Sequence, residues 1–198
     1  MGPWEMLTLW QKVADSPEQC LIVGETGGAL LSAKGLSINP HISFAGCSPL
    51  DYLHVPGGQG VRREVDNLRL PGFVAAQAKT CEAVLFVCTG AFVLHAAGLL
   101  SGKAVTTHWA SLDRLRALGE VDVREQRFVR DRAVWSSAGV SAGMDLMLAP
   151  IASVADPETA GQAQLQAEDY PYVSLLRRGT AAGAGADLHQ TPTCIRHP

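Results

Sequence analysis

The sequence has no Cys-x-x-Cys pair, no long apolar run and no excess of basic residues, and each absence excludes a class of protein. Its five cysteines are odd in number and widely scattered, so neither a zinc knuckle nor a disulfide framework is indicated. No apolar run approaches the length of a membrane span, and the first residues lack the basic and apolar regions of a secretory signal. The formal charge of −3 gives no reason to expect nucleic acid or an anionic membrane as partner. We therefore expect a reduced, cytoplasmic protein.

The chain is long and apolar enough for one compact domain. Its 198 residues are 47% hydrophobic, which allows a well-filled core. Strand-like and helix-like segments alternate, as in an α/β fold with a mostly parallel sheet covered by helices on both faces. Residues 177–198 are rich in Gly, Ala, Thr and Pro and have no apolar period. We expect an α/β domain over residues 1–172 and a poorly ordered tail over residues 173–198.

The most informative segment surrounds Cys88. Five residues suited to a buried strand, Ala83–Val87, lead directly into Cys88, a Thr-Gly pair and an apolar helix that we expect to reach Leu100. A cysteine at such a junction sits on a sharp turn above the positive end of the helix, which favours the nucleophilic thiolate. The arrangement is the cysteine counterpart of the nucleophile turn in α/β hydrolases. The alternative is an inert, buried cysteine that closes a parallel strand. Reacting groups of open α/β sheets gather at the carboxyl ends of strands, so we predict a nucleophilic or redox role for Cys88.

Two glycines and a threonine are expected beside this cysteine. Gly57 and Gly58 follow the strand-like segment Tyr52–Val55, and without side chains they let backbone N–H groups approach a substrate. We predict that these N–H groups, together with the N–H of Thr89, stabilise developing negative charge. The alternative for the glycines is a plain turn that ends a strand. The Thr89 hydroxyl either binds near the sulfur or caps the following helix.

Histidines and small residues offer weaker candidates. His108 closes a strand-like segment and either supports the site from outside it or is a hydrogen-bonded structural residue beside Trp109. His54 and His95 lie within apolar elements and are interpreted as core or interface residues, and no pair of histidines has the spacing of metal ligands. Residues 136–143 either line a pocket near Cys88 or allow a helix to pack closely on the sheet.

Six segments together resemble the DJ-1/PfpI superfamily, whose fold is of the class I glutamine amidotransferase type. They occur in the order and spacing of that family and cover most of residues 2–172. The resemblance is strongest to the isonitrile (isocyanide) hydratase branch and to the related sensor halves of AraC-type regulators. The segments are Gly2–Glu5, Val55–Gly58, Val87–Ala91, Ala97–Gly102, Thr106–Trp109 and Ser137–Gly143.

This resemblance implies a flavodoxin-like sandwich, commonly a homodimer, with Cys88 as the nucleophile. In the hydratase branch the thiolate attacks the terminal carbon of a small isocyanide, and water resolves the thioimidate to an N-substituted formamide without a metal or organic cofactor. Thr89 stands where the PfpI-type proteases carry a histidine, and a threonine cannot act as a general base at neutral pH. The resemblance therefore argues against peptidase activity. The alternatives are a non-catalytic thiol sensor or ligand-binding domain and, more weakly, glyoxalase-like chemistry on small dicarbonyls.

The start of the sequence departs from the family pattern. In the family, the Gly-Pro-x-Glu segment follows a complete first strand and an acidic residue that hydrogen-bonds the nucleophilic cysteine. Here the sequence begins at Met1, so we expect either an N-terminally truncated chain or a misplaced start codon, and impaired activity of a chain that lacks both features. Glu5 either supports the site as a remaining carboxylate or is a solvated or capping residue of the first helix.

Overall fold

A four-stranded sheet lies at the centre of the structure, a computed structural model that describes residues 1–169. Its strands β5, β6 and β10 are parallel, and β9 joins the edge antiparallel to β10. All five residues of β6 are buried, as expected for a central strand covered on both faces. The predicted tail at residues 173–198 lies outside the described residues. The strand order is β5 (Tyr52–Val55), β6 (Ala83–Val87), β10 (Val134–Ser137) and β9 (Phe128–Asp131).

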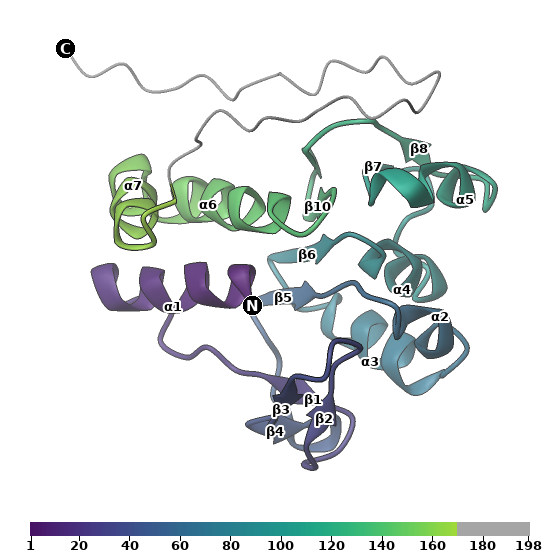
Figure 1. Cartoon of the computed structure of the whole chain (residues 1–198), viewed down its shortest axis with the longest axis horizontal. Coiled ribbons are helices and arrows are strands. Elements are labelled where there is room, and N and C mark those ends of the chain that lie inside the picture. The colour runs from purple at the N-terminus through teal and green to yellow at the C-terminus, as the bar shows by residue number, and fades with distance from the viewer. Residues whose placement is uncertain (170–198) are drawn as a thin grey trace.

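Helices cover both faces of this sheet, so the predicted α/β sandwich is present (Figure 1). The helices on one face are α1 (Gly2–Ala14), α6 (Ala142–Val154) and α7 (Pro157–Gln166). Those on the other are α2 (Val61–Glu64), α3 (Arg69–Gln77) and α4 (Gly90–Ala96). Within the described residues, no helix has the length and apolar character that crossing a bilayer requires.

Side chains of the central strand alternate between these two helical layers. Leu85 and Val87 belong to the hydrophobic cluster that includes Met6 of α1. Val84 and Phe86 belong to the opposite cluster, with the side chains of α3 and α4. The alternation follows from the two-residue period of a strand. It determines which face of the sheet each side chain near the carboxyl end lies on.

Three pairs of short strands flank the central sheet. Two lie between α1 and β5: β1 (Val23–Gly24) pairs with β4 (Ile42–Ser43), and β2 (Leu30–Leu31) with β3 (Ser37–Ile38). The third consists of β7 (Ala104–Val105) and β8 (Asp122–Val123). Short 3-10 turns η1 (Phe44–Gly46) and η2 (Trp109–Ser111) and helix α5 (Leu112–Arg116) complete the described elements.

The helix after Cys88 is shorter than predicted. It ends at Ala96 rather than at Leu100, because Gly98 has a φ of 73° and turns the chain out of the helix. The Leu99 N–H then donates to the Leu94 carbonyl oxygen at 3.0 Å, which satisfies one of the last carbonyls of α4.

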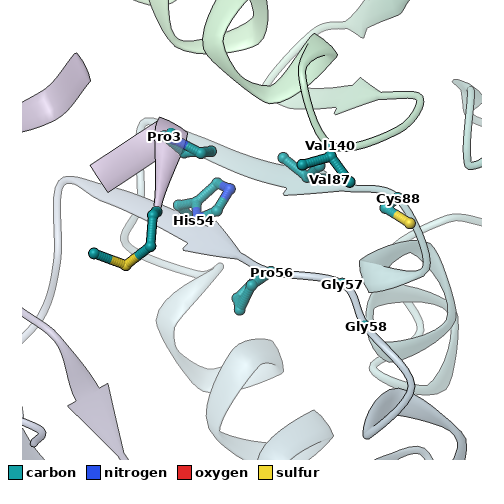
Figure 2. A pocket seen from close by; sticks show the side chains of 10 residues that line it. Pro3, His54, Pro56, Gly57, Gly58, Val87, Cys88 and Val140 are labelled. Atoms are coloured by element: carbon teal, nitrogen blue, oxygen red, sulfur yellow. The ribbon is translucent and has the colours of Figure 1, made fainter. Parts of the chain in front are cut away.

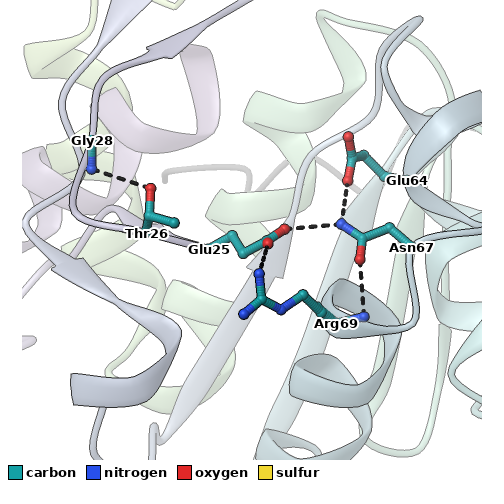
Figure 3. A network of polar contacts seen from close by, with 6 residues as sticks. All are labelled: Glu25, Thr26, Gly28, Glu64, Asn67 and Arg69. Carbon is teal, nitrogen blue, oxygen red and sulfur yellow. Dashed lines mark hydrogen bonds and ion pairs between the residues drawn. The ribbon is translucent and has the colours of Figure 1, made fainter.

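A polar network fastens the loop after β1 to the connection between α2 and α3 (Figure 3). Asn67 Nδ2 donates to Glu25 Oε2 at 2.9 Å and to Glu64 Oε2 at 3.0 Å, and Arg69 forms an ion pair with Glu25. The hydrogen bonds from Asn67 and Arg69 lower the pKa of Glu25. The network therefore anchors the outlying β1–β4 pair to the helical layer beside the sheet.

Candidate active site

Cys88 lies at the junction of β6 and α4 in a left-handed backbone conformation. Its φ is 59°, which is unusual for a residue other than glycine, so the predicted sharp turn is present. The Cys88 N–H donates to the Ser137 carbonyl oxygen at 3.0 Å, which ties the turn to the end of β10. The cysteine side chain is half-buried rather than sealed in the core. The geometry is that of a nucleophile turn at the carboxyl edge of the sheet.

Gly57 lies against the backbone of this turn. A Cβ atom on Gly57 would be 2.6 Å from the Val87 carbonyl oxygen, 2.7 Å from Thr89 N and 2.9 Å from Cys88 Cβ. A reciprocal contact exists at Gly90, where a Cβ would be 2.7 Å from the Val55 carbonyl oxygen. The turns that follow β5 and β6 therefore approach each other so closely that glycine is required on both sides.

The Thr89 hydroxyl binds the glycine loop instead of capping α4. Its Oγ1 accepts a hydrogen bond from the Gly58 N–H at 2.9 Å and donates to the Gly58 carbonyl oxygen at 3.1 Å. No side-chain capping bond is made from Thr89 to α4. This pairing corrects part of the sequence-based prediction: the Gly58 N–H is already engaged. Within residues 1–169, the N–H groups of Gly57 and Thr89 donate no hydrogen bond and are the ones left for a ligand.

A pocket of about 210 Å³ opens beside Cys88. Figure 2 shows Cys88 and His54 along it, from the two neighbouring strands β6 and β5. Most of the lining is apolar, and no carboxylate is among the described residues that line it. Those residues are Met1, Gly2, Pro3, His54, Pro56, Gly57, Gly58, Val87, Cys88 and Val140.

Sequence reasoning missed the position of His54 in this pocket. His54 Nε2 is buried and has no hydrogen-bond partner among the described residues. Burial, together with the positive charge of the N-terminal ammonium, lowers the pKa of His54 to about 4, so the imidazole is neutral at pH 7. The signal was present in the strand pattern: Leu53 and Val55 are buried on one face, so the residue between them faces the other, near the carboxyl end of β5.

Glu5 and His108 do not line this pocket. Glu5 is exposed in the first turn of α1, because Met6, Leu9 and Trp10 form the buried face of that helix. His108 is half-buried, and its Nδ1 accepts a hydrogen bond from the Ala110 N–H at 3.3 Å. This contact is the one expected of a hydrogen-bonded structural histidine beside Trp109.

The segment 136–143 both lines the pocket and allows a helix to pack closely on the sheet, the two roles that the sequence left open. Val140 is 85% exposed and lines the pocket. A Cβ atom on Gly143 would lie 2.9 Å from Pro3 Cγ and 3.1 Å from Val87 Cγ2, so this glycine allows close packing of α1, α6 and β6. Within residues 1–169, no group of three His, Cys, Asp or Glu side chains is placed to hold a metal ion.

Comparisons with known proteins agree with this geometry. Isonitrile hydratase from Pseudomonas putida is 37% identical over 170 residues, which cover 86% of this chain and 72% of the hydratase. The crystal structure of a THiJ/PfpI family protein from Pseudomonas syringae superposes with a TM-score of 0.78 and 33% identity, over 87% of this chain and 71% of that one. The HTH-type transcriptional regulator GbdR from Pseudomonas aeruginosa is 33% identical over 62% of this chain, which spans 33% of the regulator. Residues 1–153 match the DJ-1/PfpI family, and the chain belongs to that family.

Proposed function

We propose that the chain hydrates small isocyanides to N-substituted formamides, with Cys88 as the nucleophile. The observation that carries the proposal is the position of Cys88: a half-buried thiol on a left-handed turn, open to a mostly apolar pocket. Similarity to a protein named isonitrile hydratase supports the substrate class. An isocyanide is itself apolar except at its reacting carbon and nitrogen, which suits such a lining.

The reaction needs only the thiol and one water molecule. The sulfur of Cys88 forms a bond to the terminal carbon of R–N≡C, and the thiol proton ends on that carbon, which gives the thioimidate R–N=CH–S. Water then adds its oxygen to the same carbon, with one hydrogen going to nitrogen. The carbon–sulfur bond breaks, the sulfur takes back the remaining hydroxyl proton, and R–NH–CHO leaves.

Backbone donors assist where negative charge develops. The Gly57 and Thr89 N–H groups are the donors beside Cys88 that are not engaged within the described residues. In the proposed mechanism they stabilise the oxygen of the intermediate that water forms. The Thr89 hydroxyl holds Gly58 and so fixes the loop that carries one of these donors.

Apolar side chains receive the R group. Pro3, Val87 and Val140 line the pocket and present no hydrogen-bonding side chain to the substrate. Among the described lining residues, His54 with its neutral imidazole is the other titratable side chain besides Cys88.

We also propose that the chain acts as a homodimer, which multi-angle light scattering of the purified protein tests directly.

The experiment is to incubate the protein with benzyl isocyanide and to follow N-benzylformamide by NMR. Formamide production should disappear in Cys88→Ser and persist in Cys81→Ser. Cys81 is a suitable control because it is also half-buried, lies outside the pocket lining, and burial raises its pKa to about 11. No formamide from the unsubstituted chain, or equal production by Cys88→Ser, contradicts the proposal.

A second candidate function is a thiol sensor without catalysis. It is favoured by the same half-buried sulfur at the mouth of a pocket, since an accessible, activated thiol oxidises readily to sulfenic or sulfinic acid. Peptide-resolved mass spectrometry after mild peroxide tests it. Oxidation of Cys88 no faster than that of Cys81 would count against a sensor.

A further inference from the structure

The carbonyl oxygen of Cys88 is held by a side chain that lies outside the pocket. Thr107 Oγ1 donates to this oxygen at 2.7 Å, and Thr107 is 1% exposed. Helix α4 offers the same oxygen only the Ala91 N–H at 3.4 Å, which is long for a hydrogen bond between backbone groups. Thr107 is therefore the main partner of the Cys88 carbonyl.

Both peptide groups of Cys88 are thus fixed by neighbouring segments. The Cys88 N–H donates to the Ser137 carbonyl oxygen at 3.0 Å, and the carbonyl accepts from Thr107 on the other side. A left-handed conformation costs a non-glycine residue free energy and persists only where its surroundings hold it. The φ of 59° at Cys88 is such a conformation, and these two hydrogen bonds are its supports.

The segment that carries Thr107 is anchored independently of the cysteine. Thr106 N–H donates to Ser136 Oγ at 3.0 Å, and Thr106 Oγ1 donates to the Gln126 carbonyl oxygen at 3.0 Å. Ser136 Oγ in turn donates to the Val129 carbonyl oxygen at 3.2 Å. Because these partners belong to β10, β9 and the turn before β9, Thr107 is a fixed support and does not merely follow the position of Cys88.

We propose that Thr107 is a positioning residue that keeps Cys88 in its strained, reactive conformation. The inference rests on the proposed function, because it takes Cys88 as the reacting group. Without the Thr107 hydroxyl, the carbonyl of the half-buried Cys88 loses its main partner, and the 1% exposed side chain at position 107 leaves little room for water to replace it. The backbone of Cys88 then relaxes, and its sulfur leaves the position beside the Gly57 and Thr89 N–H groups.

The test compares two identical substitutions at adjacent buried threonines. Thr107→Val removes the hydroxyl bound to Cys88, and Thr106→Val removes a hydroxyl of equal burial that is bound to Gln126 instead. The readouts are the rate at which iodoacetamide alkylates Cys88, measured by peptide mass spectrometry over a range of pH, and the turnover of benzyl isocyanide. We expect Thr107→Val to slow both about five- to tenfold, the equivalent of one hydrogen bond. Thr107→Ser should stay within about twofold of the unsubstituted protein, and so should Thr106→Val, because the Thr106 N–H still donates to Ser136 Oγ and keeps the segment anchored.

Equal alkylation rates in Thr107→Val and Thr106→Val overturn the inference, and so does a Thr107→Ser variant as slow as Thr107→Val. If Thr107→Val does not fold, Thr107→Ser and Thr107→Ala provide the same comparison, since both lose the methyl group and only serine keeps the hydroxyl. Alkylation that follows the Thr107 hydroxyl in a protein that leaves isocyanides unchanged supports the positioning role and rejects the proposed function.

Discussion

Gly57 and Cys88 meet backbone against backbone, so closely that a Cβ on Gly57 would lie 2.9 Å from the Cβ of Cys88. The contact joins the ends of two adjacent parallel strands, β5 and β6. It brings the Gly57 backbone against the turn that carries Cys88, without any intervening side chain. Such proximity is what an oxyanion site needs, and no residue larger than glycine provides it.

Gly57→Ala should therefore displace the turn that carries Cys88. The added methyl meets backbone atoms that cannot rotate away, so we expect a loss of about 1–3 kcal/mol in the free energy of unfolding and a loss of Cys88 reactivity. Gly72→Ala is the matched control, because a Cβ there has no atom within 4 Å and lies within α3. That variant should be neutral or more stable by about 0.5–1 kcal/mol. Urea unfolding and alkylation of Cys88 measure both effects, and an equal outcome at the two glycines contradicts the argument.

Ser136 and Ser137 allow a second comparison of matched substitutions. Both are fully buried, but Ser136 Oγ takes part in two hydrogen bonds while Ser137 Oγ has no partner among the described residues. Ser136→Ala should cost about 1–3 kcal/mol, because it leaves buried backbone groups unpaired. Ser137→Ala should leave stability unchanged or raise it, since it removes an unsatisfied hydroxyl. Chemical denaturation measures the free energy of unfolding of both variants. A larger loss in Ser137→Ala than in Ser136→Ala would contradict this prediction.

His54 predicts a dependence of stability on pH. Its pKa falls from an ordinary 6.5 to about 4 in the folded protein, so between these values the unfolded chain binds a proton that the folded one does not. Stability should therefore be complete above pH 6.5 and decline as the pH falls toward 4, by up to about 3 kcal/mol. His54→Gln should flatten this part of the curve in urea titrations at a series of pH values. A slope that is unchanged in His54→Gln would assign the effect to other groups.

Two substitutions of Thr89 distinguish the role of its hydroxyl group from that of its methyl group. Thr89→Val removes both hydrogen bonds to Gly58 and should release the loop that carries the Gly57 N–H. We expect formamide production to fall about tenfold or more, with a smaller change in the free energy of unfolding, because the residue is near the surface. Thr89→Ser keeps the hydroxyl and should retain most of the activity. If serine and valine behave alike, the loop is held by other contacts.

The sequence was sufficient for the turn at Cys88 because its signals are local. A continuous apolar strand, a cysteine and a Thr-Gly pair define a strand-to-helix junction without reference to distant residues, and the contact with Gly57 follows from the adjacency of parallel strands. The exposed position of Glu5 was also readable, since Met6, Leu9 and Trp10 mark the buried face of α1 at helical spacing.

Other features depend on contacts between distant segments. The bond from Thr107 to the Cys88 carbonyl joins residues nineteen positions apart, and no periodicity in either segment indicates it. The choice of Thr89 Oγ1 to bind Gly58 instead of the first turn of α4 is likewise settled by a loop thirty-one residues away. The apolar neighbours of His54 indicated a core or interface residue, whereas the start of α1 leaves a pocket beside its strand.

The first residues of α1 form one wall of that pocket, with Gly2 packed against Met144 and Pro3 against Gly143. Residues fused ahead of Met1, such as an affinity tag or a cleavage scar, would therefore begin at a wall of the pocket that Cys88 also lines. The design of the expression plasmid thus becomes an experimental variable, and turnover should be compared between proteins that carry different leading residues.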